Sequence, residues 1–173
     1  MQSRLRDRVK VLQKFISIAM KCKEIGNFNT MMAIFSGLAT ISVHRLKVTW
    51  TQISKKAKAD FDSLKELTSK DHNFRLFRQA MQKSPCTVPY MGLFLQDLLV
   101  TDEVLSNYDE HKLINLQKRR RWKQVTDQLW PIEKKPSSDQ VIFESSPIIQ
   151  NFLVSYIPRD DKWLYERSVT VEP

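Results

Sequence analysis

The chain has 173 residues, of which 42% are hydrophobic and 3 are glycine, and its formal net charge is +9. A chain of this length forms one domain with a sizeable core, which excludes several independent domains. No apolar run is long enough to cross a membrane and no signal-peptide core is present, so a cytoplasmic protein without a membrane-spanning segment is expected.

The spacing of apolar residues predicts an all-α fold. Residues 4–24 carry apolar side chains every three or four positions, and Gly26 is placed to end this helix in a left-handed conformation. Asn27 or Asn29 caps a next helix over about 29–38, which is apolar on so many sides that we expect it to be buried. Further helices are expected to begin at three polar residues: Ser42, Thr51 and Asp71.

Two long helices separated by a short turn are predicted in the C-terminal half. Pro89 favours a helix start, and apolar residues carry that helix to about residue 105. After a turn at 107–109, a second helix covers about 110–130 and stops at Pro131. Helices joined by so few residues pack antiparallel, which predicts a helical hairpin. A solvated loop and two shorter helices are expected at 133–139, 146–156 and 161–168.

Charge is distributed unevenly over this hairpin. Residues 91–110 contain five acidic side chains and no lysine or arginine, whereas residues 118–123 form the densest basic run of the chain. The basic residues either pair with the acidic helix and brace the hairpin or form a solvated helix face. Nucleic-acid binding is a weaker alternative, because Trp122 is the only aromatic residue in the run and no known reader motif is present.

Residues for covalent catalysis or metal binding are not grouped in a familiar pattern. The sequence lacks a Gly-rich phosphate loop, a His-Glu-x-x-His motif and a Cys-x-x-Cys motif. Cys22 and Cys86 make neither a metal-binding spacing nor a disulfide framework, so reduced structural thiols are expected. The histidines stand on three different predicted elements: His44, His72 and His111. We therefore expect no metal, no cofactor and no enzyme of the covalent kind.

Four stretches in a defined order resemble the catalytic domain of Ras-type guanine-nucleotide exchange factors, the RasGEF family. They are residues 26–35 (GNFNTMMAIF), 43–50 (VHRLKVTW), 88–103 (VPYMGLFLQDLLVTDE) and 114–120 (INLQKRR). The C-terminal residues 165–173 resemble the tail that closes the family domain. The resemblance implies an all-α domain with a protruding antiparallel hairpin. This hairpin would insert near the magnesium and phosphate site of a Ras-subfamily GTPase and promote GDP release.

The same resemblance implies roles for individual residues. Leu99 falls where the family has a leucine that blocks the magnesium position, and Glu103 falls where a glutamate competes for the groups that held phosphate. These two would be the catalytic residues, and their i, i+4 spacing places them on one helix face. Residues implied to contact the GTPase are Asn29, Arg45, Phe74, Phe77, Gln96 and Asp97. Residues implied to support the hairpin are Lys118, Arg119 and Arg120.

Most of these residues also have a structural interpretation. An asparagine next to a helix start is a capping residue. Arg45 would suit a buried ion pair, and Phe74 and Phe77 would suit a core stripe. In an anonymous helix, Leu99 would be a core residue and Glu103 a solvated one.

The match to the family is incomplete. The family domain begins upstream of Met1, so we expect residues 1–173 to be the C-terminal part of such a domain, without the helices that complete its core. Ala39 stands where many members have an asparagine that contacts the GTPase, and residues 131–147 differ from the usual connection. A second hypothesis is therefore a catalytically inactive module that scaffolds a GTPase or another protein. Specificity is spread over several helices, so the sequence does not name the GTPase.

Overall fold

The computed structural model describes residues 4–84, 87–129 and 144–173. All regular elements in these ranges are helices, with no strand and only two isolated β-bridges, which confirms the predicted all-α class. The helices of the described ranges are α1 (Leu5–Glu24), α2 (Phe28–Leu38), α3 (Ile41–His44), α4 (Lys47–Thr51), α5 (Lys55–Leu67), α6 (Arg75–Lys83), α7 (Met91–Val104), α8 (Leu116–Asp127), α10 (Pro147–Ser155) and α11 (Asp161–Val171).

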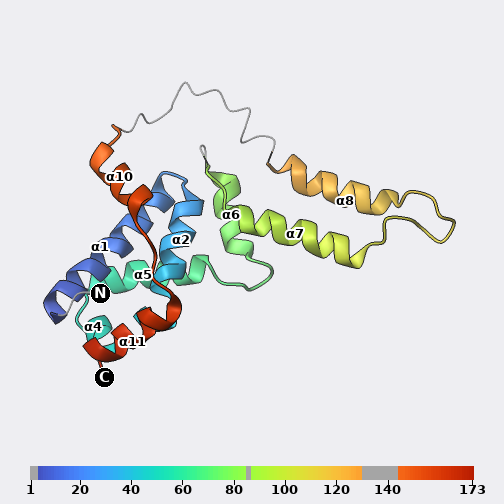
Figure 1. The fold of residues 1–173 in the computed structure, drawn as a ribbon. Coiled ribbons are helices and arrows are strands. Elements are labelled where there is room, and N and C mark those ends of the chain that lie inside the picture. The colour runs from blue at the N-terminus through green and yellow to red at the C-terminus, as the bar shows by residue number, and fades with distance from the viewer. Residues whose placement is uncertain (1–3, 85–86, 130–143) are drawn as a thin grey trace.

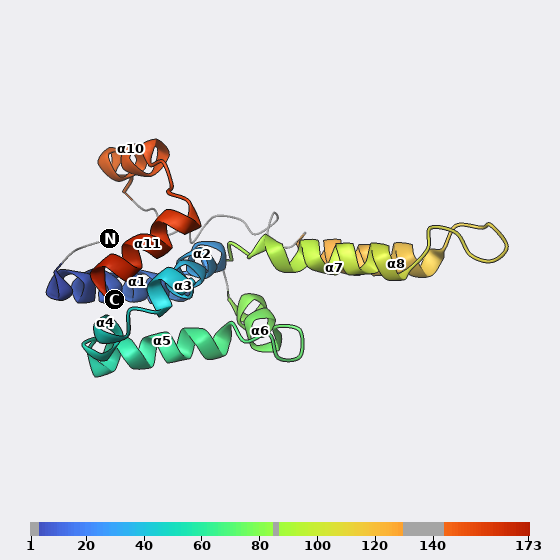
Figure 2. The same cartoon turned by 60° about the horizontal axis from the view of Figure 1, so that its bottom comes forward.

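Helix α1 lies at the centre of a helical body that also contains α2 to α6 and α11 (Figures 1 and 2). Ile16 and Ala19 of α1 are fully buried. Residues from α1, α2, α5 and α6 form the larger core cluster, together with side chains from the beginning of α7 and the end of α8. A smaller cluster packs α1 against α2 and α5, with the Trp50 and Phe61 rings 4.6 Å apart at its edge.

Helices α7 and α8 lie side by side, run in opposite directions and extend away from the body in both views (Figures 1 and 2). We call residues 91–127 the α7/α8 arm. The connection between its helices is ordered by backbone hydrogen bonds from Asp109 N to Leu113 O (2.8 Å) and from Asn115 N to Asn107 O (3.0 Å). The Asn115 side chain caps α8, so this helix begins at Leu116 rather than at residue 110 as predicted.

Several predicted helix ends are confirmed and others are shifted. Gly26 has φ 76° and ends α1, and the Asn27 side chain caps α2. The cap of α5 is Ser54, because Thr51 still belongs to α4. The helix expected from Asp71 begins four residues later as α6. The shift arises because the three preceding residues have positive φ, which a right-handed helix excludes: His72, Asn73 and Phe74.

Three other predictions differ from the structure. Helix α2 is buried on one side only, with Met31 fully buried and Ala33 exposed. Ser42 lies inside α3, which begins at Ile41. Helix α7 begins two residues after Pro89, with Tyr90 as its N-terminal flanking residue. The predicted helix end at Pro131 and the loop at 133–139 lie outside the described residues.

A buried ion pair attaches the C-terminus to the body. Glu172 Oε1 lies 3.1 Å from Arg8 Nη2, and both side chains are more than nine-tenths buried. The same carboxylate accepts hydrogen bonds from Val48 N, from Thr49 N and from the Thr49 hydroxyl. Burial raises the pKa of the Glu172 carboxyl, but the bonds from Thr49, Arg8 and the two backbone groups outweigh it, so the net pKa lies below its ordinary value.

We expect this carboxylate to make folding pH-dependent. Folding lowers the pKa of Glu172. The ionised carboxylate therefore adds to the free energy of unfolding above the unfolded carboxyl pKa of about 4.3, and this stabilisation is lost as pH falls through the folded pKa. Glu172→Gln should lower the free energy of unfolding at pH 7 by about 2 to 3 kcal/mol. In urea unfolding between pH 7 and pH 3, the free energy of unfolding of the wild type should fall towards that of the variant. A constant difference between them would contradict the assignment.

Apolar side chains remain exposed on α1 and on α10. Val11, Phe15 and Ile18 of α1 are 42%, 46% and 37% exposed. Helix α10 has no buried residue, and its Ile148 is 82% exposed. Contiguous apolar surface of this kind favours association. None of the described helices has the length and apolarity needed to cross a bilayer.

We therefore expect residues 1–173 on their own to self-associate. Sedimentation velocity should show oligomers whose fraction rises with concentration, because burying these side chains removes apolar surface from water. The double change Ile148→Lys and Phe152→Lys should shift the distribution towards monomer. A monomeric wild type that unfolds cooperatively over the same concentration range would contradict this expectation.

Candidate functional site

The segment that leads into α7 is attached to the start of α2 by backbone pairing. Val88 N donates to Gly26 O at 2.9 Å, and Asn29 N donates to Val88 O at 3.2 Å. Asn29, predicted to contact a GTPase, is exposed and uses its backbone here. The Asn-Phe-Asn segment therefore positions the residues that lead into the α7/α8 arm.

Three aromatic rings then join the arm to the core. Phe77 of α6 meets Phe28 of α2 edge to face at 5.5 Å between centroids, and it meets Tyr90 in the same way at 6.3 Å. A Cβ atom at Gly92 would lie 2.5 Å from Tyr90 Cζ, so glycine leaves room for this ring. Phe77 is 0% exposed. The prediction that its ring faces a GTPase is therefore wrong for this structure, because the ring fills the core.

The predicted catalytic residues lie on the outer half of α7. Leu99 is 58% exposed, and Glu103 is exposed one turn later on the same face. Among the described residues, Glu103 has no hydrogen bond or ion pair. Gln96 is exposed near them. An apolar side chain and an uncompensated carboxylate thus stand together in solvent, where a partner can reach both.

Two predicted contact residues are already bound within the chain. Asp97 makes a bidentate ion pair with Arg78, at 2.7 and 2.9 Å. Arg45 donates to the backbone oxygen of Glu172 at 2.7 Å, and its guanidinium lies 5.8 Å from the centre of the Tyr165 ring. Arg45 thus has a structural role at the C-terminus, although it is half-buried and bonds a backbone oxygen instead of forming the buried ion pair of the structural interpretation.

The expected support of the arm by basic residues involves one residue of the three. Lys118 Nζ lies 2.6 Å from Asp102 Oδ1 across the two helices, and the lysine side chain is 3% exposed. Arg119 instead lies over the ring of Trp122 within its own helix, 4.9 Å from the centroid. Arg120 is exposed and pairs with none of the described acidic residues. The prediction of acidic partners for Arg119 and Arg120 is therefore wrong among the described residues, where both side chains are exposed, as the solvated-face alternative expects.

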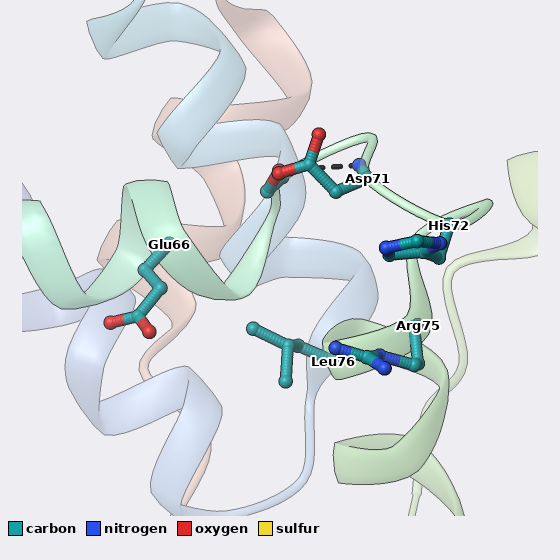
Figure 3. A pocket seen from close by; sticks show the side chains of 6 residues that line it. Glu66, Asp71, His72, Arg75 and Leu76 are labelled. Atoms are coloured by element: carbon teal, nitrogen blue, oxygen red, sulfur yellow. Dashed lines mark hydrogen bonds between the residues drawn. The ribbon is translucent and has the colours of Figure 1, made fainter.

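An open cavity of about 400 Å³ lies at the junction of α5 and α6 (Figure 3). Glu66 of α5 lies across the cavity from His72 and Arg75, so acidic and basic side chains both line it. Phe74, predicted to contact a GTPase, adjoins it in a left-handed conformation and packs partly on the core. No sequence pattern predicts this cavity, because it depends on the left-handed turn before α6.

Other reactive groups remain separate. The described part of the chain brings together no three His, Cys, Asp or Glu side chains that could hold a metal ion. Cys22 is buried, and burial raises the pKa of its thiol, which agrees with a protonated structural cysteine. Cys86 lies outside the described residues.

Comparison with known proteins identifies the family. Residues 1–120 match the RasGEF domain. Ras guanine nucleotide exchange factor Y of Dictyostelium discoideum is 34% identical over 99% of this chain and 11% of its own length. Ras-specific guanine nucleotide-releasing factor 1 is 31% identical in Homo sapiens and 30% identical in Rattus norvegicus, over 96% of this chain and 13% of each protein. This chain, which spans only about an eighth of those relatives, therefore belongs to the RasGEF domain family.

Proposed function

We propose that this chain promotes GDP release from a Ras-subfamily GTPase by placing α7 beside the magnesium and phosphate site. The observation that carries the proposal is the exposed pair of Leu99 and Glu103 on an arm that stands clear of the body. Family membership supports it, as do the relatives named above, which are exchange or releasing factors for Ras.

The two residues would weaken nucleotide binding in different ways. A GTPase holds its nucleotide through a phosphate loop of backbone N–H groups and a magnesium ion. Leu99 offers the ion no ligand and fills its space, whereas the Glu103 carboxylate competes with phosphate for positively polarised donors. A factor that binds the nucleotide-free GTPase more tightly than the GDP-bound form lowers the barrier to release. No covalent bond is made or broken.

The competing function is a scaffold that binds a GTPase without accelerating release. Its support is that Asp97 and Arg45, two of the predicted contact residues, are bound internally, and that Phe77 is buried. Release of GDP by the unmodified chain distinguishes the two functions, because a scaffold would bind and leave the rate unchanged.

Changing Glu103 should slow exchange without unfolding the chain. Glu103→Ala removes an exposed carboxylate that has no partner among the described residues, so thermal unfolding should stay close to wild type. Loss of about 1.4 kcal/mol of stabilisation at the barrier would slow GDP release about tenfold. Release of a fluorescent GDP analogue from a Ras-subfamily GTPase measures this effect.

The matched control is Glu110→Ala, which removes the same charge from the exposed loop of the arm. It should leave the release rate near wild type. Equal rates for wild type and Glu103→Ala would remove Glu103 from the mechanism. Equal slowing by both changes would indicate a general charge effect rather than a specific contact.

The Lys118–Asp102 pair should support exchange through the arm. Lys118→Met keeps the packing of the buried side chain but removes its charge, and Asp102→Asn removes the partner charge. In a double-mutant cycle on the GDP release rate, residues in one network should couple by about 0.5 kcal/mol or more. Strict additivity would show that the ion pair does not brace the arm.

The exposed residues Arg119 and Arg120 serve as controls for this double-mutant cycle. Arg120→Glu should change exchange little, because exposed charges contribute about 0 to 1 kcal/mol. Binding of the Arg119→Glu and Arg120→Glu variants to generic DNA at two salt concentrations tests the nucleic-acid alternative. Salt-sensitive binding that these changes abolish would support it.

A further inference from the structure

One guanidinium group connects the body to the middle of α7. Arg78 of α6 donates from both terminal nitrogens to the two oxygens of Asp97, at 2.7 and 2.9 Å. Its Nε donates to the backbone oxygen of Asn73 at 2.9 Å, and Nη2 lies 3.4 Å from the Asn73 side-chain oxygen. The left-handed turn before α6, the helix α6 and the arm therefore meet at a single planar group.

The pair lies at the edge of the packed part of the arm. Leu93 and Phe94 of α7 and Val125 of α8 are buried in the core, and Leu98 packs against it. Beside Asp97, by contrast, a cavity of about 470 Å³ separates the turn from α7 and α8, with Asn73, Gln96 and Arg121 among its lining residues. An open space of this size offers no steric resistance to a tilt of the arm on that side.

A small tilt at the root becomes a large displacement at the far end. Helix α7 is about 20 Å long at 1.5 Å per residue, so a tilt of about 10° moves its end by about 3 to 4 Å. Displacements of about 1 Å at a reacting site can slow a step about 100-fold. A contact that fixes the angle of α7 therefore governs where Leu99 and Glu103 stand.

We propose that Arg78 is a positioning residue that sets the angle of the α7/α8 arm through its bidentate bond to Asp97. This inference rests on the proposed exchange function for its effect on rate, but the angle itself can be measured without a GTPase. The planar guanidinium suits this role because two parallel bonds restrict rotation as well as distance, which a single lysine bond does not. Asp97 then acts on the GTPase through the direction of the arm rather than by direct contact.

Arm direction is measured as a distance between two spin labels. The labels are placed on Glu110→Cys at the end of the arm and Lys14→Cys on α1, both exposed, in a chain carrying Cys22→Ala and Cys86→Ser. Pulsed electron paramagnetic resonance then gives the distance distribution for the wild-type pair and three variants: Arg78→Ala, Arg78→Lys, and the exchange Arg78→Asp with Asp97→Arg. The same proteins are assayed for GDP release over a range of GTPase concentrations.

Arg78→Ala should broaden or shift the distance distribution. It should also lower the maximal release rate about tenfold, while the GTPase concentration that gives half of this rate changes less than about twofold. Arg78→Lys should fall between this variant and wild type. The exchanged pair should restore a narrow distribution and part of the rate. The matched control is Lys123→Ala, which breaks an exposed ion pair to Asp127 within α8 and should change neither measurement.

An unchanged distribution in a folded Arg78→Ala chain would overturn the proposal, even if release slows, since the pair would then act by direct contact. A broadened distribution with an unchanged release rate would overturn the claimed effect of the angle on exchange, while leaving Arg78 as the residue that sets the angle. If the wild type releases no GDP, the proposed exchange function fails, while the distance measurement still decides whether Arg78 sets the angle of the arm.

Discussion

The packing of Phe77 between Phe28 and Tyr90 is the contact from which the arrangement of the arm follows. The three rings come from α2, from α6 and from the residue before α7, so one buried contact brings together segments far apart in sequence. Edge-to-face rings of this kind add to the burial of apolar area and have a preferred geometry. The body therefore presents α7 from a fixed point, and the polar contacts of Val88 and Arg78 act on an arm that is already anchored.

Charge plays a different role at each position in this strongly basic chain. Near the C-terminus, Arg8 and Glu172 form a desolvated pair that closes the body. In the arm, Lys118 is buried against α7, whereas its neighbours Arg119 and Arg120 are exposed. Since buried pairs depend on geometry and exposed ones are screened by salt, the net charge of +9 says little about function. The position of each charge relative to the helix axes decides its effect.

Much of the fold could be predicted from the sequence, and the reasons for the exceptions are physical. Periodic apolar residues locate α1, α5 and α7 because a helix repeats its own face, which is local information. The left-handed turn at residues 72–74 could not be predicted, because none of its residues is glycine and other residues rarely adopt positive φ.

The candidate site shows the same division. Leu99 and Glu103 could be placed on one helix face, since their spacing determines it, but the exposure of Leu99 depends on the tertiary structure. The internal partners of Asp97 and Arg45 could not be predicted, because Arg78 and the C-terminal residues that bind them are remote in sequence.

The loop that joins the two helices of the arm is itself held by hydrogen bonds. The Asp109 side chain accepts hydrogen bonds from His111 N and Leu113 N, and Asn115 closes the loop onto α8. An arm whose two helices are already joined by a folded loop loses little conformational entropy on binding, so under the proposed exchange function more of its contact energy would remain available to displace the nucleotide.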